Sequence, residues 1–209
     1  MHFVSRRIAC FCDKVFDAEI ADSADLEADP DVEKQIDSGD FMAVTCPQCG
    51  KRLTPEFPFR LALRGGRGEL LMVPEKDRGG LARGKLDYPA DNPYRIVVGF
   101  PELAEKLRIL ADGFDDRVIE IMKYYLLTGS MADEDQERDI TLRYKGQEEG
   151  RHVFHVLGMK EGEIGVARLG GDVYKKIAAD IDARAGEDPF RDFCTPPWIS
   201  VRRLSGASA

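Results

Sequence analysis

The chain has 209 residues, a hydrophobic content of 43% and a formal net charge of −8. These values are ordinary for a globular protein with one large domain or two small ones. No apolar run approaches the roughly 20 residues that a membrane-spanning helix needs. The residues before Cys10 contain no apolar stretch typical of a signal peptide. We therefore expect a cytoplasmic protein without membrane contact, in which clustered cysteines favour a metal over disulfides.

Four of the five cysteines occur in two tight clusters, Cys10-Phe11-Cys12 and Cys46-Pro47-Gln48-Cys49-Gly50. Residues i and i+2 of an extended strand share a face, so both cysteines of the first cluster can reach one metal ion. In the second cluster Pro47 stiffens the turn and Gly50 permits a positive φ. Two such turns that face each other can satisfy a tetrahedral zinc ion. The predicted ligands of this structural zinc are Cys10, Cys12, Cys46 and Cys49.

Two other interpretations of the cysteine clusters stay open. The first cluster is one residue shorter than C-x-x-C, which leaves a metal-free turn as an alternative. A redox dithiol is the other, but it favours C-x-x-C at the start of a helix, and here the chain after Gly50 continues as a strand towards Pro55. Cys194 stands alone and is expected to be an ordinary thiol rather than a replacement ligand. His152 and His155 lie three residues apart in a predicted strand and are expected to be structural or solvated.

The acidity is concentrated between the two cysteine clusters. Residues 17–40 contain ten acidic residues and one lysine, a net charge of −9 that leaves +1 for the rest of the chain. A solvated loop and helix face explains this pattern, and a surface for a basic partner is the alternative.

The residue patterns predict an α+β fold. Strands flank the first cysteine turn over residues 7–20, a helix spans 29–38, and a further hairpin spans 57–73. We predict that residues 1–74 form a zinc-ribbon-like β unit with an acidic helical insert.

Residues 75–92 lack periodicity and are rich in glycine and charge, as in a linker or long loop. A strand at 95–100 and two helices, at 101–112 and 115–127, follow and are expected to pack as an antiparallel pair. Residues 75–130 thus form the second predicted segment, which we expect to pack with the first segment as one domain. After an acidic connector at 131–138, residues up to 209 are predicted to form a small antiparallel sheet and a helix at 172–185.

A basic stretch at residues 60–85 suggests an alternative function. It contains Arg64-Gly65-Gly66-Arg67-Gly68 and Arg78-Gly79-Gly80, which are similar to segments that follow a nucleic-acid backbone. Interleaved aromatic residues are missing, and the acidic balance of the chain opposes non-specific binding to phosphate. Nucleic-acid binding through Arg64, Arg67, Arg78 and Arg83 is therefore the alternative, not the favoured, prediction.

Residues 8–127 resemble the CpXC family, a bacterial and archaeal group named for paired C-P-x-C motifs. The resemblance rests on Cys46-Pro47-Gln48-Cys49-Gly50, on the helix that starts at Asp29-Pro30-Asp31, and on the strand and helices between Arg95 and Leu127. The chain departs from the family at Cys10-Phe11-Cys12-Asp13, which lacks the proline and one residue. The family has no assigned reaction, so the resemblance implies a metal site and no catalytic residues.

No nucleophile–base pair or paired-carboxylate signature is evident in the sequence. We therefore expect a non-enzymatic module with structural zinc that contacts another protein.

Overall fold

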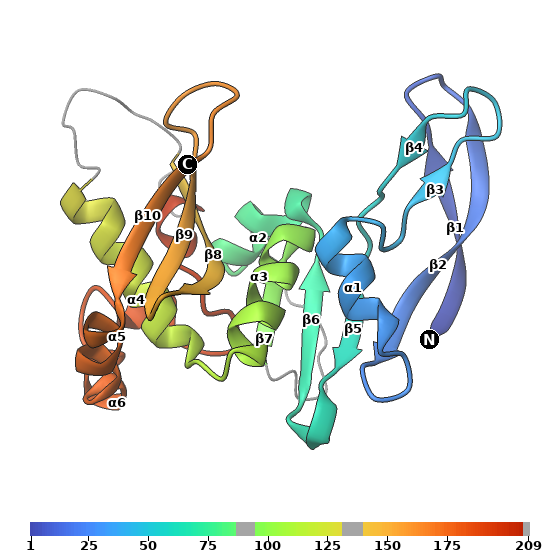
Figure 1. The fold of residues 1–209 in the computed structure, drawn as a ribbon. Coiled ribbons are helices and arrows are strands. Elements are labelled where there is room, and N and C mark those ends of the chain that lie inside the picture. The colour runs from blue at the N-terminus through green and yellow to red at the C-terminus, as the bar shows by residue number, and fades with distance from the viewer. Residues whose placement is uncertain (87–94, 131–139, 207–209) are drawn as a thin grey trace. The chain divides into compact units, whose positions relative to one another are not determined.

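The computed structural model describes residues 1–86, 95–130 and 140–206 (Figure 1). The chain divides into two compact units, Met1–Ala104 (unit 1) and Glu105–Ala209 (unit 2). The expected acidic connector at 131–138 lies outside the described residues, as does part of the expected linker. In the described part of the chain, no helix is long and apolar enough to cross a membrane.

Unit 1 is built on a mixed five-stranded sheet with the order β1-β2-β5-β6-β7. Its strands are β1 (His2–Ala9), β2 (Val15–Asp25), β5 (Phe59–Ala62), β6 (Glu69–Val73) and β7 (Arg95–Val98). The pairs β1–β2 and β5–β6 are antiparallel hairpins, whereas β2–β5 and β6–β7 are parallel. The β1–β2 register pairs Ala9 with Val15, which places the first cysteine cluster at the end of that hairpin.

The chain between β2 and β5 carries the helix and the second cysteine cluster. Helix α1 (Asp31–Ser38) buries Val32 and Ile36, which lie one turn apart, and ends at Gly39 with a φ of 74°. A small hairpin follows, formed by the two-residue strands β3 (Val44–Thr45) and β4 (Arg52–Leu53). In Figure 1 this small hairpin lies beside the ends of β1 and β2 that carry the first cluster.

The core of unit 1 lies over β5–β7. Phe59, Leu61, Leu70 and Met72 share one face of β5 and β6 and have no exposed surface. All four residues of β7 are buried, so both faces of that strand are covered. The turn between β5 and β6 is a 3-10 turn, η1 (Arg64–Gly66). The prediction of a loop at 75–92 is wrong for the part of this segment that the structure describes. That part forms the turn η2 (Glu75–Asp77) and the short helix α2 (Arg78–Ala82).

Unit 2 packs an antiparallel sheet against helices. Helix α3 (Gly99–Ala111) crosses the division between the units, and α4 (Asp116–Tyr125) follows, capped by the Asp115 side chain. A π-helical turn, η3 (Leu126–Ser130), continues α4. The sheet has the order β10-β9-β8, with β8 (Thr141–Glu148), β9 (Arg151–Leu157) and β10 (Gly165–Gly170). The predicted α+β class and the small C-terminal antiparallel sheet are confirmed.

The remaining helices of unit 2 are short. The helix predicted at 172–185 is instead two helices, α5 (Gly171–Ala178) and α6 (Ile181–Arg184), followed by α7 (Arg191–Cys194) and α8 (Arg203–Gly206). One hydrophobic core joins α4 to the sheet through residues such as Ile119, Met122 and Phe154, all fully buried. Helix α4 therefore shares its core with β8 and β9, and the division into the segments 1–74, 75–130 and 131–209 stays a prediction.

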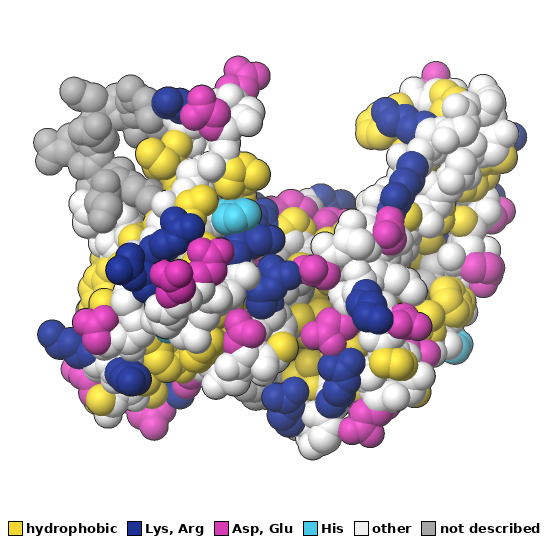
Figure 2. Space-filling model, in the orientation of Figure 1, with side chains coloured by type: hydrophobic (Ala, Val, Ile, Leu, Met, Phe, Trp, Pro, Cys, Tyr) yellow, Lys and Arg dark blue, Asp and Glu magenta, His cyan; other side chains and the backbone are white. Residues whose placement is uncertain are grey.

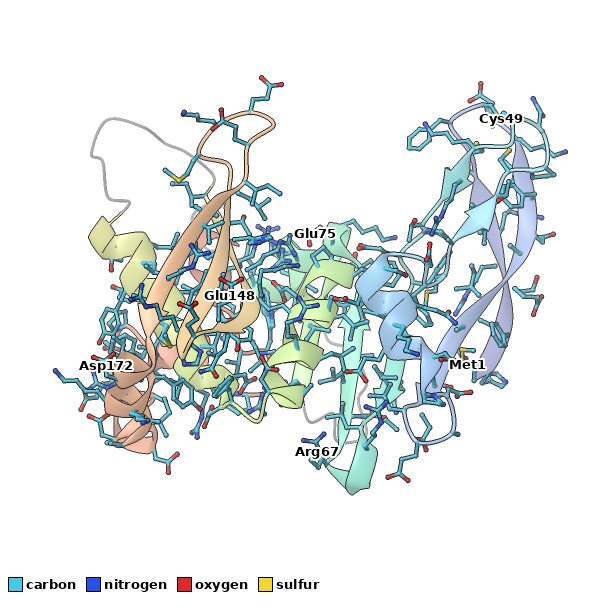
Figure 3. The ribbon with its side chains drawn as sticks, in the orientation of Figure 1. Met1, Cys49, Arg67, Glu75, Glu148 and Asp172 are labelled. Atoms are coloured by element: carbon cyan, nitrogen blue, oxygen red, sulfur yellow. The ribbon has the colours of Figure 1, made fainter. Side chains whose placement is uncertain are left out.

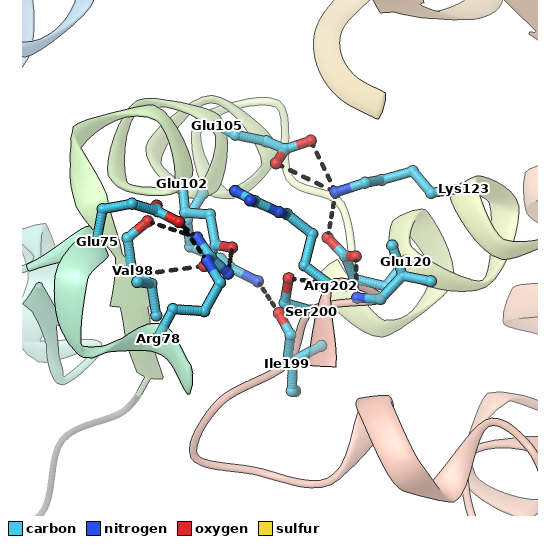
Figure 4. Close-up of polar contacts among 12 residues, drawn as sticks. Glu75, Arg78, Val98, Glu102, Glu105, Glu120, Lys123, Ile199, Ser200 and Arg202 are labelled. Atoms are coloured by element: carbon cyan, nitrogen blue, oxygen red, sulfur yellow. Dashed lines mark hydrogen bonds and ion pairs between the residues drawn. The ribbon is translucent and has the colours of Figure 1, made fainter. Parts of the chain in front are cut away.

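A group of charged side chains is buried within unit 2 (Figure 4). The Lys123 ammonium lies 3.1 and 3.2 Å from the two carboxylate oxygens of Glu105 and 2.8 Å from Glu120. Each carboxylate also accepts a backbone N–H, Glu105 from Tyr144 and Glu120 from Val201. The cluster thus ties β8 and the C-terminal segment to α3 and α4.

His152 on β9 is buried among aromatic rings, with Phe114 at 4.8 Å and Tyr174 at 5.0 Å between ring centroids. Burial lowers the pKa of His152, so the folded state holds it neutral. Because the unfolded state then binds more protons, stability is lost as the pH falls below the ordinary histidine pKa of about 6.5.

We expect His152→Phe to remove this component of the acid destabilisation, measured by urea denaturation between pH 8 and pH 5. Equal pH slopes for wild type and variant would contradict this assignment.

Candidate metal centre

Two turns bring the four clustered cysteines together at the end of the β1–β2 and β3–β4 hairpins (Figure 3, near the label of Cys49). The four Sγ atoms all lie within 4.8 Å of one another. Two contacts join the clusters, with 3.6 Å between the sulfurs of Cys10 and Cys49 and 3.7 Å between those of Cys12 and Cys46. All four predicted ligands therefore lie in one place, although the first cluster is a residue short.

The sulfur positions fit a tetrahedral metal ion. Zinc–sulfur bonds of about 2.3 Å require sulfur–sulfur edges of about 3.8 Å, close to the distances of 3.6 and 3.7 Å between the clusters. Four soft thiolates suit zinc and would fill its tetrahedral coordination.

The surroundings of Cys46 and Cys12 shift the pKa values of these two thiols in opposite directions. Burial raises the pKa of Cys46, but the backbone N–H groups of Cys49 and Gln48 donate to its sulfur and bring the pKa down to about 6. For Cys12, the backbone N–H of Lys14 lowers the pKa, but burial and the three neighbouring thiols outweigh it and raise the pKa to about 12. Four sulfurs this close cannot all ionise without a cation, and a divalent metal supplies that charge.

The two turns close in the same way despite their different lengths. In the longer one the Gly50 N–H donates to the Cys46 carbonyl, and in the shorter one the Asp13 N–H donates to the Cys10 carbonyl. Gly50 has a φ of 69° and Asp13 a φ of 64°. Asp13 therefore takes the left-handed position that glycine takes in the other cluster, at a cost in strain.

We expect Asp13→Gly to tighten metal binding. Relief of the left-handed strain amounts to about 0.5 to 1 kcal/mol, or about a two- to fivefold gain in zinc affinity in competition with a chelating dye. The matched control is Asp17→Gly, an exposed position within β2, where glycine weakens the strand and gives no gain. Unchanged or weaker affinity for Asp13→Gly would show that the turn is not strained.

The end of the two hairpins also exposes an aromatic ring. Phe11 lies between two cysteines and is 84% exposed, and the Lys51 ammonium lies 4.5 Å from the centroid of its ring. Val15 nearby is 50% exposed. Figure 2 shows hydrophobic and basic side chains next to each other at this end of unit 1. The exposed ring of Phe11 thus lies at the surface next to the cysteine cluster.

The fifth cysteine and two of the histidines belong to unit 2. Cys194 is buried in its core, and burial raises the pKa of this thiol to about 12. His152 lies inside that unit and His155 is half-buried on β9. Within the described residues, the group that could hold a metal ion consists of the four clustered cysteines and contains none of these three.

The basic stretch does not form one surface of free cations. The Arg78 guanidinium is buried and contacts Glu75 and Glu102, the latter at 2.7 Å (Figure 4). The Arg64 guanidinium lies 2.7 Å from Glu33 on α1. Arg67 donates to the Arg64 carbonyl, and Arg83 is exposed. The buried Arg78 guanidinium therefore stabilises the start of α3 and is not presented for a phosphate contact. The sequence alone did not indicate this role.

We expect Arg78→Lys to lower the stability of unit 1 by about 2 kcal/mol, because lysine cannot reproduce the forked contacts with two carboxylates. The exposed Arg83→Lys is the control and is expected to change stability by less than about 0.5 kcal/mol. Hydrogen exchange of the β5–β7 amides measures both. Equal protection in the two variants would show that the fork is dispensable.

A family model and a curated relative match the chain. The model of the CpXC family, described as CpXC protein, matches residues 8–123. An uncharacterised protein of Treponema pallidum (strain Nichols) is 27% identical over 188 residues, which cover 82% of this chain and 86% of that protein. No solved structure matches. The family match spans more than half of the chain and includes all four clustered cysteines, so the chain belongs to the CpXC family.

Proposed function

We propose that the protein is a non-enzymatic, cytoplasmic zinc-binding module in which Cys10, Cys12, Cys46 and Cys49 hold one structural zinc ion. The observation that carries the proposal is the convergence of four Sγ atoms within 4.8 Å from two separate turns. Cytosolic thiols stay reduced and available to metals, whereas four thiolates around one ion leave it a poor Lewis acid. When bound, the zinc would supply folding free energy to the β3–β4 hairpin, whose two-residue strands are too short to stand alone.

The test is zinc per chain by elemental analysis, on untagged protein purified without chelator. We expect about one zinc per chain for the wild type and almost none for the Cys10→Ser/Cys12→Ser variant. Cys194→Ser serves as the control, because its thiol lies in the core of unit 2, and it should retain the wild-type content. A wild type without zinc, or a double variant that keeps it, would refute the metal proposal.

We further propose that the module contacts another protein through the exposed end of its hairpins. Phe11 supports this, because an aromatic ring held in place by a turn and by Lys51 loses little entropy on binding. The test compares proteins captured by the zinc-loaded wild type with those captured by Phe11→Ala and by the control Tyr125→Ala, which removes a ring from unit 2. Proteins lost only with Phe11→Ala support the proposal, and identical captures would contradict it.

A further inference from the structure

The pairing of the four sulfurs across the two clusters has a chemical consequence that goes beyond metal binding. Two sulfur–sulfur contacts join the clusters, Cys10 to Cys49 at 3.6 Å and Cys12 to Cys46 at 3.7 Å. A disulfide requires about 2.05 Å, so each pair must close by about 1.6 Å, a movement that two cysteine side chains can share.

Each cross-cluster pair combines one accessible sulfur with one buried sulfur. Cys49 is exposed and its neighbour Cys10 is buried, whereas Cys12 is partly exposed and its neighbour Cys46 is buried. This is the arrangement that a two-step thiol oxidation needs, since the accessible sulfur meets the oxidant and the buried sulfur resolves the product.

The shortened first cluster opposes pairing within a cluster. A bond between Cys10 and Cys12 would close a ring with a single residue between the two cysteines, which strains the disulfide dihedral away from its preferred value near 90°. If Cys46 bonded to Cys49, only this strained bond would remain for the other two sulfurs. Two unstrained disulfides therefore require partners from opposite clusters.

We propose that this site is also a modification site for hydroperoxides, which convert it into two cross-cluster disulfides, Cys10–Cys49 and Cys12–Cys46, and release the metal. The proposal rests on the proposed zinc-binding function. The Cys49 thiolate attacks one peroxide oxygen, the O–O bond breaks, and a sulfenic acid and hydroxide form. The Cys10 thiolate then attacks the Cys49 sulfur, forms the disulfide and displaces a second hydroxide.

The second pair reacts in the same way, with Cys12 as the attacking and Cys46 as the resolving sulfur. In total, four thiolates and two molecules of hydrogen peroxide give two disulfides, four hydroxide ions and one free Zn²⁺. Four electrons pass from sulfur to the peroxide oxygens. Since both new bonds join the β1–β2 turn to the β3–β4 turn, the oxidised protein keeps its two hairpins together after the metal has left.

The experiment starts from zinc-loaded full-length Cys194→Ser protein, with zinc per chain measured first so that a failure of metal binding is recognised separately. Hydrogen peroxide is titrated while a chelating dye records free zinc. We expect full release at about two peroxides per chain, reversed by dithiothreitol with added zinc. Non-reducing digestion with trypsin should link peptide 8–14 to peptide 35–51, and fragmentation within the linked pair should assign Cys10 to Cys49 and Cys12 to Cys46.

Disulfides within the clusters would overturn the proposal. So would zinc retention at tenfold excess of peroxide in a chain shown to hold zinc.

Discussion

Cys46→Ser is expected to abolish zinc binding and to melt the β3–β4 hairpin while the β5–β7 core of unit 1 stays folded. Cys46 is 1% exposed, and the backbone N–H groups of Cys49 and Gln48 donate to its sulfur. A serine hydroxyl stays protonated at neutral pH and does not replace a thiolate ligand. Structural zinc contributes about 10–16 kcal/mol of binding free energy, far more than a pair of two-residue strands can supply.

Amide hydrogen exchange measures this result residue by residue. We expect the protection of residues 44–53 to fall at least a hundredfold in Cys46→Ser, with little change in β6, whose residues Leu70 and Met72 are fully buried. Cys194→Ser is the matched control and should leave both regions protected. If the β3–β4 amides of Cys46→Ser stay protected, the zinc is not the element that holds this hairpin.

Lys123→Met is expected to destabilise unit 2 by about 3–5 kcal/mol, the range for removal of one partner from a buried ion pair. Lys123 is 2% exposed and is the cation between Glu105 and Glu120. Burial raises the pKa of Glu120, an effect that Lys123 opposes. Without the ammonium, two buried carboxylates lose the cation that they share, and each is still needed to accept a backbone N–H.

The pH dependence of this deficit follows from the raised pKa. A carboxyl whose folded pKa is raised contributes stability below its ordinary pKa of about 4.3 and loses that contribution as the pH rises through the folded value. The deficit of Lys123→Met should therefore be larger at pH 8 than at pH 5. Urea denaturation followed by Trp198, the single tryptophan of the chain and a buried residue of unit 2, measures it.

Lys160→Met is the control for the lysine substitution. Lys160 is 71% exposed and lies 3.5 Å from the exposed Glu163, so its loss should change stability by less than about 0.5 kcal/mol. A Lys123→Met variant as stable as this control would show that the buried cluster is not required for the fold.

The sequence predicted those features that depend on local patterns. The alternation of Leu142 and Tyr144 indicated a strand with one buried face, and the structure places both in the core of unit 2. Gly39 ends α1 as expected, because glycine accepts the left-handed conformation. The two cysteine motifs likewise indicated which four side chains could share a metal ion, and their sulfurs do lie together, since each motif forms a turn from local residues.

Features that depend on distant partners were not predictable. Residues 78–82 look like a loop in the sequence because of Gly79 and Gly80, but the Arg78 guanidinium contacts Glu102, 24 residues away, and the segment forms a helix. The buried Glu105, Glu120 and Lys123 read as exposed helix positions, since charged residues are rarely buried. Only the three-dimensional fold shows that Tyr144 and Val201 donate to these carboxylates.

X-ray absorption at the zinc edge of the purified wild-type protein tests the central claim most directly. The structure brings the sulfurs of both clusters within 4.8 Å of one another, so we expect four sulfur neighbours at about 2.3 Å and no lighter ligand. Two sulfurs with oxygen or nitrogen neighbours at about 2.0 Å would show that the shortened Cys10-Phe11-Cys12 cluster does not coordinate the metal, and would contradict the account.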